Sequence, residues 1–226
     1  MKCLIICSGG LDSVSMALTH INDDVTFLTF NYGQKATKES DVVEWLAKKY
    51  NKEFIKADIS SLSWIFGKDN QLTNDNVEVE GNYKPSIVVP LRNGVFIQLA
   101  LCYAYSNDFD RIVLGSHLDD CVISPETGDF SFPDCTAEYF KAMEFAAIRG
   151  VFRAQKPVYI ESASRNDWYK TDLIKKAYEI DKEALFKSWS CYKNGDKQCG
   201  VCDSCRNRRE AFAHAFIDDE TEYENN

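Results

Sequence analysis

Short apolar segments alternate with amphipathic ones along most of the 226-residue chain. Five apolar runs have the length and the β-branched content of buried strands, at 3–7, 25–30, 53–59, 111–116 and 157–160. Five other segments place apolar side chains at helical spacing, at 13–21, 35–50, 93–106, 138–150 and 168–180. Strands that alternate with helices are typical of βαβ units. We therefore predict an α/β fold with a doubly wound parallel sheet.

Three segments depart from this alternation. The helix at 93–106 is so apolar that we expect burial on most of its sides. Residues 67–84 are polar and rich in Asn, Asp and Gly, which predicts a long loop. Residues 218–226 are acidic and polar, and we expect this end of the chain to fray.

The charge balance is acidic, with 26 basic and 35 acidic side chains and a formal net charge of −9. A field of this sign repels polyphosphate backbones, so we expect no nucleic-acid partner. No apolar run approaches the ~20 residues that span a bilayer, and no secretory leader is recognisable. We expect a cytoplasmic protein without a membrane partner.

The motif Ser-Gly-Gly-Leu-Asp-Ser at 8–13 directly follows the first expected strand. A helix N-terminus offers free N–H groups and a partial positive charge, and Gly9 and Gly10 let the backbone approach an anion. With the hydroxyls of Ser8 and Ser13, the motif predicts a phosphate site. A tight capped turn is the alternative. Asp12 would accept backbone hydrogen bonds or reach a Mg²⁺ ion that bridges the phosphates.

Ligands in parallel α/β sheets gather at the carboxyl ends of the strands. The loop "FNYGQK" follows the second expected strand, and "LGSHLDD" follows the fourth. We expect both loops to border the same site as the motif at 8–13.

Four of the nine cysteines have the spacing C-x7-C-x2-C-x2-C, namely Cys191, Cys199, Cys202 and Cys205. Four thiolates without an open position describe a closed tetrahedral Zn²⁺ site of the structural kind. An iron–sulfur cluster and a redox pair are the alternatives. We predict two units: an α/β domain at 1–187, and a zinc-binding segment at 188–226 that packs on it with the tail.

The remaining cysteines fall into two groups. Cys3, Cys7 and Cys102 stand in apolar segments, and we expect them in the core. Cys121 and Cys135 stand in the polar region after the fourth expected strand, where a functional thiol is an alternative to a structural one.

The motif at 8–13 resembles the SGGxDS loop of the PP-loop ATP pyrophosphatases. With "FNYGQK", "VPLRNGVF", "FPDC" and "WSCYKNGDKQCGVCDSCRNRREAF", the chain resembles the 7-cyano-7-deazaguanine synthase (QueC) family over nearly its full length. The resemblance implies the PP-loop/HUP type of sheet. It also implies ATP with catalytic Mg²⁺, structural Zn²⁺, and a homodimer.

The resemblance further implies a ligase that converts 7-carboxy-7-deazaguanine and ammonia to the nitrile. The acid is adenylated with loss of pyrophosphate, ammonia displaces AMP to give an amide, and a second adenylation permits elimination. This chemistry belongs to the biosynthesis of queuosine-type deazapurines.

The family's functional residues map onto this sequence in three groups. The ATP-binding group is Cys7, Ser8, Gly9, Gly10, Leu11, Asp12, Ser13, Phe30, Tyr32, Gln34 and Gly115. The catalytic group is Asp12, Ser13, Arg92 and Lys170. The substrate-binding group is Arg92, Asp120, Phe132 and Asp134, with Asp134 facing the N–H edge of the base and Phe132 stacked on it. The plain structural alternatives are a paired helix-start arginine, a loop aspartate beside a buried phenylalanine, and a solvated helix lysine. We expect Asn93 to be an N-cap.

The chain also departs from the family pattern. Asn31 stands where an acid is common, Ala36 where a histidine is common, Leu91 where a glycine is common, and Thr136 where an arginine is common. The departures concern the acceptor, so the second hypothesis is a QueC-like ligase that attaches the deazaguanine to a protein amine in a defence system. Transfer-RNA sulfur transfer and nucleotide binding without turnover are further alternatives. The acidic charge argues against sulfur transfer to transfer RNA. The intact motif at 8–13 argues against nucleotide binding without turnover.

Overall fold

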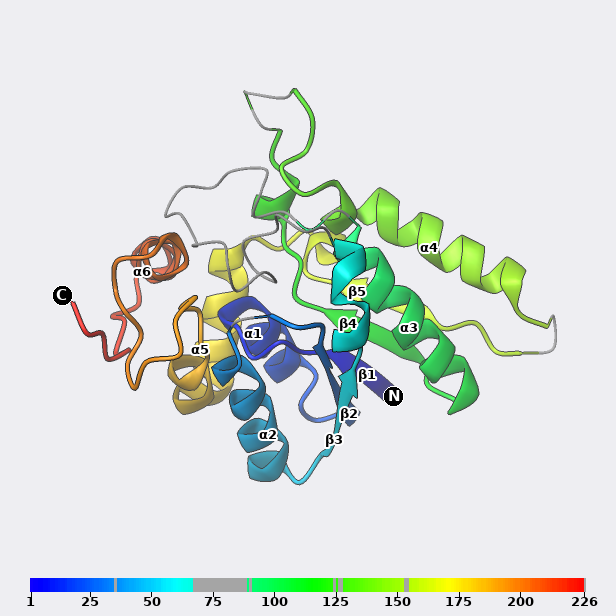
Figure 1. Cartoon of the computed structure of the whole chain (residues 1–226), viewed down its shortest axis with the longest axis horizontal. Helices are drawn as coiled ribbons and strands as arrows, with labels where there is room; N and C mark the ends of the chain where they lie inside the picture. The colour runs from blue at the N-terminus through cyan, green and yellow to red at the C-terminus, as the bar shows by residue number, and fades with distance from the viewer. Residues whose placement is uncertain are drawn as a thin grey trace.

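The computed structural model describes residues 1–34, 36–66, 89, 91–123, 125, 128–152 and 155–225. Five parallel strands form one sheet in the order β3-β2-β1-β4-β5 (Figure 1). Their bounds are β1 Lys2–Ile6, β2 Asp24–Asn31, β3 Glu53–Asp58, β4 Arg111–Leu114 and β5 Tyr159–Ser162. All five expected strands are therefore present. The loop expected at 67–84 lies outside the described residues.

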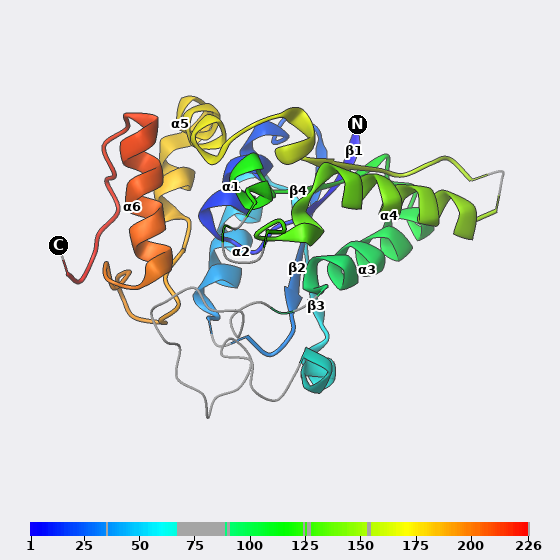
Figure 2. The same cartoon turned by 90° about the horizontal axis from the view of Figure 1, so that it is seen from above.

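Helices cover both faces of the sheet, which confirms the doubly wound α/β fold. Their bounds are α1 Leu11–Thr19, α2 Lys38–Tyr50, α3 Arg92–Ser106, α4 Ala137–Gly150, α5 Lys170–Lys187 and α6 Asp203–Ala215. The core on one face is built with α1, α2, α5 and α6, and the core on the other face with α3 and α4 (Figure 2). None of the described helices is long and apolar enough to cross a membrane.

The central strand β1 reads as a continuous apolar run because both of its faces are covered. Cys3, Leu4 and Ile5 are all fully buried, and Cys7 just beyond the strand is buried as well. Parallel strands packed on both sides have this pattern instead of an alternation of apolar and polar residues. The predicted core positions of Cys3 and Cys7 are confirmed.

The helix α3 is buried on one face only, so the expectation of burial on most sides is wrong. Ile97 and Leu101 pack against the sheet, whereas Val95 and Leu99 are exposed. Cys102 lies on the exposed face and is not a core residue. The apolar content of α3 thus leaves exposed apolar side chains on this helix, and α4 lies beside it (Figures 1 and 2).

The C-terminal segment packs on α5 through a buried arginine. Arg208 in α6 is 1% exposed and donates hydrogen bonds to the carbonyl oxygens of Leu185, Phe186 and Ser188. Phe212, one turn further on, joins the core that α1 and α5 form. A buried guanidinium is stable here because each of its nitrogens meets an acceptor.

The acidic tail does not fray up to residue 225, contrary to expectation. The Glu224 amide donates to Gln198 O at 2.9 Å, and Asn225 Nδ2 donates to Cys199 O at 2.9 Å. Gly200 adopts φ +76°, and a Cβ there would lie 2.2 Å from Asn225 O. The glycine in this turn therefore lets the tail lie against the cysteine segment.

The strand order places a switch point between β1 and β4. From β1 the chain proceeds to β2 on one side, while β4 pairs with β1 on the other. Connections leave the two strands in opposite directions, so a crevice opens at their carboxyl ends. This crevice lies beside residues 8–13 and beside the loop that starts at Gly115.

Candidate active site

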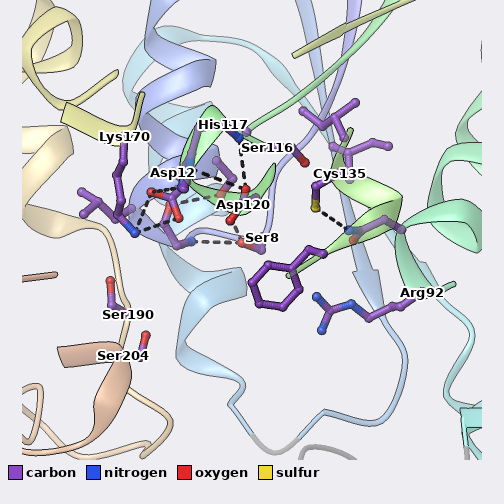
Figure 3. A pocket seen from close by; sticks show the side chains of 18 of the residues that line it. Ser8, Asp12, Arg92, Ser116, His117, Asp120, Cys135, Lys170, Ser190 and Ser204 are labelled. Carbon is purple, nitrogen blue, oxygen red and sulfur yellow. Dashed lines mark hydrogen bonds and ion pairs between the residues drawn. The ribbon is translucent and has the colours of Figure 1, made fainter. Parts of the chain in front are cut away.

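A cleft of about 1160 Å³ lies at the carboxyl ends of the strands, around residues 8–13 (Figure 3). Its walls come from the loops after β1, β2 and β4, from the first turns of α3 and α5, and from α6. Single-ligand pockets measure roughly 300–1,000 Å³. The volume is therefore sufficient for a nucleotide together with a second small molecule.

Hydrogen bonds that involve the hydroxyl groups of Ser8 and Ser13 fix the conformation of the loop at 8–13. Gly9 N donates to Ser13 Oγ at 3.2 Å, Ser13 Oγ donates to Gly10 O at 3.0 Å, and Gly10 N donates to Ser8 Oγ at 3.2 Å. The N-cap of α1 is Gly10, and no side chain caps this end of the helix. The start of α1 therefore presents free donors and its positive dipole end to the cleft, as an anion site requires.

Gly9 is required at its position for two separate reasons. Its φ of +99° is a region that side chains disfavour, and a Cβ would lie 1.9 Å from the carbonyl oxygen of Glu39. Gly115 is similar in packing, since its Cβ would lie 2.7 Å from the Asp12 backbone. The backbone of the loop at 8–13 thus packs tightly between the first turn of α2 and the residue that follows β4.

Asp12 forms the centre of a charged cluster. Lys170 Nζ lies 3.0 Å from Asp12 Oδ1, and His117 Nε2 lies 3.6 Å from the same oxygen. Burial opposes ionisation of Asp12, but Lys170 and His117 outweigh it and lower its pKa. The structure thus brings the two predicted catalytic residues Asp12 and Lys170 together, and the Lys170 side chain is half-buried instead of solvated.

His117 lines the cleft, and the sequence analysis did not single it out. It is 4% exposed, and its Nδ1 lies 3.5 Å from Asp119 Oδ2 and 3.6 Å from Asp120 Oδ2. Burial lowers the pKa of His117, but Asp12 and Asp120 raise it above its usual value. The predicted loop "LGSHLDD" contained this signal, because a histidine between a switch-point glycine and two acids faces the site.

Aromatic side chains at the carboxyl end of β2 form one wall of the cleft. Phe30 stacks on Phe96 with ring centroids 4.5 Å apart, and Tyr32 lies across the same ring. Arg92 donates to Tyr32 Oη at 3.3 Å, while its Nε has no partner among the described residues. Gln34 hydrogen-bonds within its own loop. Phe30, Tyr32, Gln34 and Arg92 all line the cleft, as the sequence analysis expected of a binding site.

Asp134 lines the cleft but also supports α3. Its Oδ2 accepts from the Asn93 amide at 3.2 Å, and its Oδ1 accepts from Asn93 Nδ2 at 3.2 Å. Asn93 is therefore not the N-cap of α3; the N-cap is Leu91, with φ +55°, a conformation that glycine favours. Each Asp134 oxygen keeps a lone pair, so base recognition by Asp134 and Phe132 stays a prediction.

The two other cysteines near the cleft are thiols at neutral pH. Burial raises the pKa of Cys121 to about 11 and raises that of Cys135 further. Cys135 Sγ accepts from Asn93 Nδ2 at 3.2 Å. A thiol with a raised pKa is a poor nucleophile at neutral pH, which favours the structural alternative for both residues.

Glu39 is the second site residue that the sequence analysis missed. It stands in the first turn of α2 and lines the cleft beside the phosphate loop. Burial raises the pKa of its carboxyl to about 8, with Arg92 lowering and Asp12 raising it. No motif marked this residue, because a glutamate in the first turn of a helix is common for dipole reasons alone.

The C-terminal segment supplies the opposite wall of the cleft. Asn207, Glu210 and His214 stand at helical spacing on α6 and line the cleft. Ser190 and Ser204 line it as well, across from Lys170 and Arg92 (Figure 3). The sequence analysis assigned only a structural role to this segment. The i, i+3, i+7 spacing of these three polar side chains was the available signal.

The four cysteines of the C-terminal segment converge on one point. Their Sγ atoms all lie within 4.8 Å of one another, with Cys199–Cys205 at 3.9 Å and Cys202–Cys205 at 3.4 Å. A tetrahedron with ~2.3 Å Zn–S bonds has edges of ~3.8 Å. The four-thiolate set of Cys191, Cys199, Cys202 and Cys205 therefore forms a site of the size that a single metal ion requires.

The fold and the site define an α/β protein with a glycine-rich loop at its switch point and a cluster of four cysteines at the separation that a single metal ion requires. Residues 2–216 match the family described as queuosine biosynthesis protein QueC. The chain belongs to this family, as the resemblance implied.

Curated relatives align with the whole chain. The 7-cyano-7-deazaguanine synthase of Methanosphaera stadtmanae is 33% identical over 99% of this chain and 98% of its own length. The 7-cyano-7-deazaguanine synthase 2 of Colwellia psychrerythraea is 32% identical over 98% of both chains. The synthase of Brucella ovis is 34% identical over 99% of this chain and 94% of its own.

Proposed function

We propose that this chain converts 7-carboxy-7-deazaguanine and ammonia to 7-cyano-7-deazaguanine with ATP. The observation that carries the proposal is the uncapped loop at 8–13, with the Asp12–Lys170 pair beside it, in a chain of the QueC family. An anion loop that also holds a cation is the arrangement that pyrophosphate departure requires. The volume of the cleft accommodates both substrates.

The adenylation step follows from the placement of the charges. The substrate carboxylate attacks the α-phosphorus of ATP, a P–O bond forms, and the bond to pyrophosphate breaks. The amides that start α1 and the Lys170 ammonium would hold the negative charge on the leaving pyrophosphate. Arg92, whose Nε is unpartnered among the described residues, would neutralise the acid before attack. The amide oxygen is adenylated at the same place in the second cycle.

We place the nucleotide on the side of the cleft that carries the aromatic residues and the loop glycines. Phe30 and Tyr32 would flank the base, and Gly115 would admit the sugar beside Cys7 and Leu11. Phe132, Asp134 and Asp120 would hold the deazaguanine on the opposite side. This division keeps the two planar groups apart and brings their reactive ends together at the loop.

Two metals fit the donor sets that the chain offers. The carboxylates of Asp12, Asp119 and Asp120 each lie within 3.6 Å of the His117 ring, and such hard oxygen ligands would suit Mg²⁺. Mg²⁺ would neutralise phosphate charge when ATP is bound. The thiolate cluster suits Zn²⁺ in a structural role, worth about 10–16 kcal/mol of apparent binding in zinc-finger peptides.

We also propose a homodimer, which the outer surfaces of α3 and α4 support. Val95, Leu99, Phe145 and Ile148 are 37%, 39%, 66% and 39% exposed. Apolar side chains gathered on two neighbouring helices mark an interaction surface more often than a solvated one. A second copy of the chain is the partner that we assign to this surface.

Pyrophosphate release tests the proposed reaction. The protein, ATP and Mg²⁺ are combined with the carboxydeazaguanine and ammonium, and the small-molecule product and the intact protein are analysed by mass spectrometry. Nitrile formation with two pyrophosphates per product is the expected result. A deazaguanine adduct on added protein would instead establish the protein-amine reaction. Pyrophosphate release with transfer RNA alone would overturn both.

A further inference from the structure

Glu39 lies directly over the phosphate loop. Its Oε1 would stand 3.5 Å from a Cβ built on Gly10, and its backbone carbonyl packs on Gly9. The side chain is half-buried and lines the cleft. It comes from α2, whereas the Asp12 cluster comes from α1, α5 and the loop after β4. Glu39 therefore approaches the loop from the side that Lys170 and His117 do not occupy.

The Glu39 carboxylate has no hydrogen bond and no ion pair within the part of the chain that the structure describes. The charged groups that influence it are Arg92 of α3 and Asp12 of α1, and the neutral groups are Cys7 and Tyr32. A half-buried carboxylate without a partner has a raised pKa, and a cation beside it would favour its ionised form. Such a group is retained where a cation or a proton joins it during the reaction.

The cleft as a whole attracts small cations. Apart from Glu39, its described lining carries five carboxyl groups, from Asp12, Asp119, Asp120, Asp134 and Glu210. Its permanently cationic side chains in the same described lining are Arg92 and Lys170. A cleft with a net negative charge concentrates cations relative to bulk solvent. Ammonia is present mainly as the ammonium ion at neutral pH, so the field favours entry of the nitrogen source in its unreactive form.

We propose that Glu39 binds this ammonium ion and removes its proton next to the acyl-adenylate. The inference rests on the proposed function. Ammonium gives one proton to the Glu39 carboxylate, and the resulting ammonia attacks the acyl carbon. A C–N bond forms, the C–O bond to AMP breaks with its electron pair leaving on AMP, and a second proton passes to solvent.

The rival role for Glu39 is to support the loop. Its backbone carbonyl already supports Gly9, whatever the side chain is. A supporting side chain would hydrogen-bond to the loop amides, yet the described contacts of the loop are made by Ser8 and Ser13. The two roles differ in one respect that can be measured. If Glu39 acts as a base, a nucleophile that is already uncharged does not need it. If Glu39 supports the loop, every nucleophile needs it.

The test compares Glu39→Gln and Glu39→Asp with Glu44→Gln, a control on the exposed side of α2. Adenylation is measured by ATP–pyrophosphate exchange with the carboxydeazaguanine, and capture by amide formation from ammonium or by hydroxamate formation from hydroxylamine. Hydroxylamine is uncharged at neutral pH and needs no base to enter as a nucleophile. Thermal unfolding reports the fold of each variant.

We expect Glu39→Gln to keep exchange within about twofold and to lose amide formation by about 10²–10⁴-fold, the range for a general base. Hydroxylamine restores capture, and Glu39→Asp retains part of the ammonium reaction. Equal losses with both nucleophiles, unchanged amide formation, or lost exchange with a lower unfolding temperature would overturn the proposal. Absence of exchange in the unaltered protein would instead reject the proposed function, which distinguishes the two failures.

Discussion

Lys170 Nζ lies 3.0 Å from Asp12 Oδ1, although 158 positions of the chain separate the two residues. The contact joins the first turn of α5 to the first turn of α1 at the base of the cleft. Both helices direct their positive dipole ends toward the same region. The pair therefore holds the Lys170 ammonium beside the N-terminus of α1.

Removing this cation should slow adenylation without unfolding the protein. We expect Lys170→Met to reduce pyrophosphate exchange by about 10²–10³-fold, the loss typical of one group that stabilises developing charge. Lys175→Met, on the exposed side of the same helix, is the control and should exchange normally. Pyrophosphate exchange and thermal unfolding are measured on both. Normal exchange in Lys170→Met would limit the lysine to an ordinary ion pair.

Gly9→Ala should destabilise the protein more than a substitution at another left-handed glycine. Both Gly9 and Gly128 have positive φ, at +99° and +72°, but a Cβ at Gly128 meets no atom of the described residues within 4 Å. Gly128→Ala therefore carries only the backbone cost of roughly 1–2 kcal/mol. Gly9→Ala adds the collision with Glu39 O, which typically costs a further ~1–3 kcal/mol. Urea unfolding measures both, and equal losses would contradict the packing found at Gly9.

The elements and the phosphate loop could be predicted because each has a local cause. The strand runs, the helical spacing and the glycines at 9 and 10 act within a few residues of one another. Asp12 and Lys170 came from motif resemblance, and the structure joins them. Leu91 illustrates a local rule that the chain breaks, because its positive φ suits the glycine common at that position.

The remaining features depend on contacts between distant segments. Glu39 reaches the site because Gly9 admits the α2 backbone, and no periodicity reports such a contact. The tail was expected to fray on composition, yet it binds the turn at Gly200 through backbone groups that composition does not reveal. The exposed face of α3 looked like core because an exposed apolar face and an apolar core share one pattern.

Cys202→Ser should lose the metal and lower the stability of the C-terminal segment. Its thiolate is one of four at metal-binding separation, and the segment that it organises carries Arg208 and the tail. Elemental analysis and thermal unfolding are measured beside Cys102→Ser, whose exposed thiol lies outside the cluster. The control should keep its metal and its unfolding temperature. Full retention of zinc in Cys202→Ser would reject a four-thiolate site.

Phe145→Glu should separate the proposed dimer. The ring is 66% exposed on α4, so a carboxylate there is tolerated by the folded monomer but not by an apolar interface. Phe216→Glu is the control, because that ring is 91% exposed at the end of α6. Light scattering after gel filtration should give half the mass for Phe145→Glu alone. A dimer that persists in this variant would place the interface elsewhere.

His20 should make the stability of the protein depend on pH, at the end of the sheet opposite the cleft. Its Nδ1 lies 3.3 Å from Asp23 Oδ2 and its Nε2 lies 3.4 Å from Glu161 Oε1. Burial alone would lower the pKa of His20, but the contacts with Cys3, Glu161 and Asp23 raise it to about 10. The native state thus retains a proton that the unfolded chain releases near 6.5.

The sign of the effect follows from this difference. The stabilising contribution of His20 is complete below about pH 6.5 and is lost as the pH rises to about 10. Within that window the free energy of unfolding should fall by up to about 1.4 kcal/mol per pH unit, the slope for one proton. Urea unfolding across the window checks the slope, and His20→Asn should flatten it. An equal slope in that variant would show that the proton resides on another group.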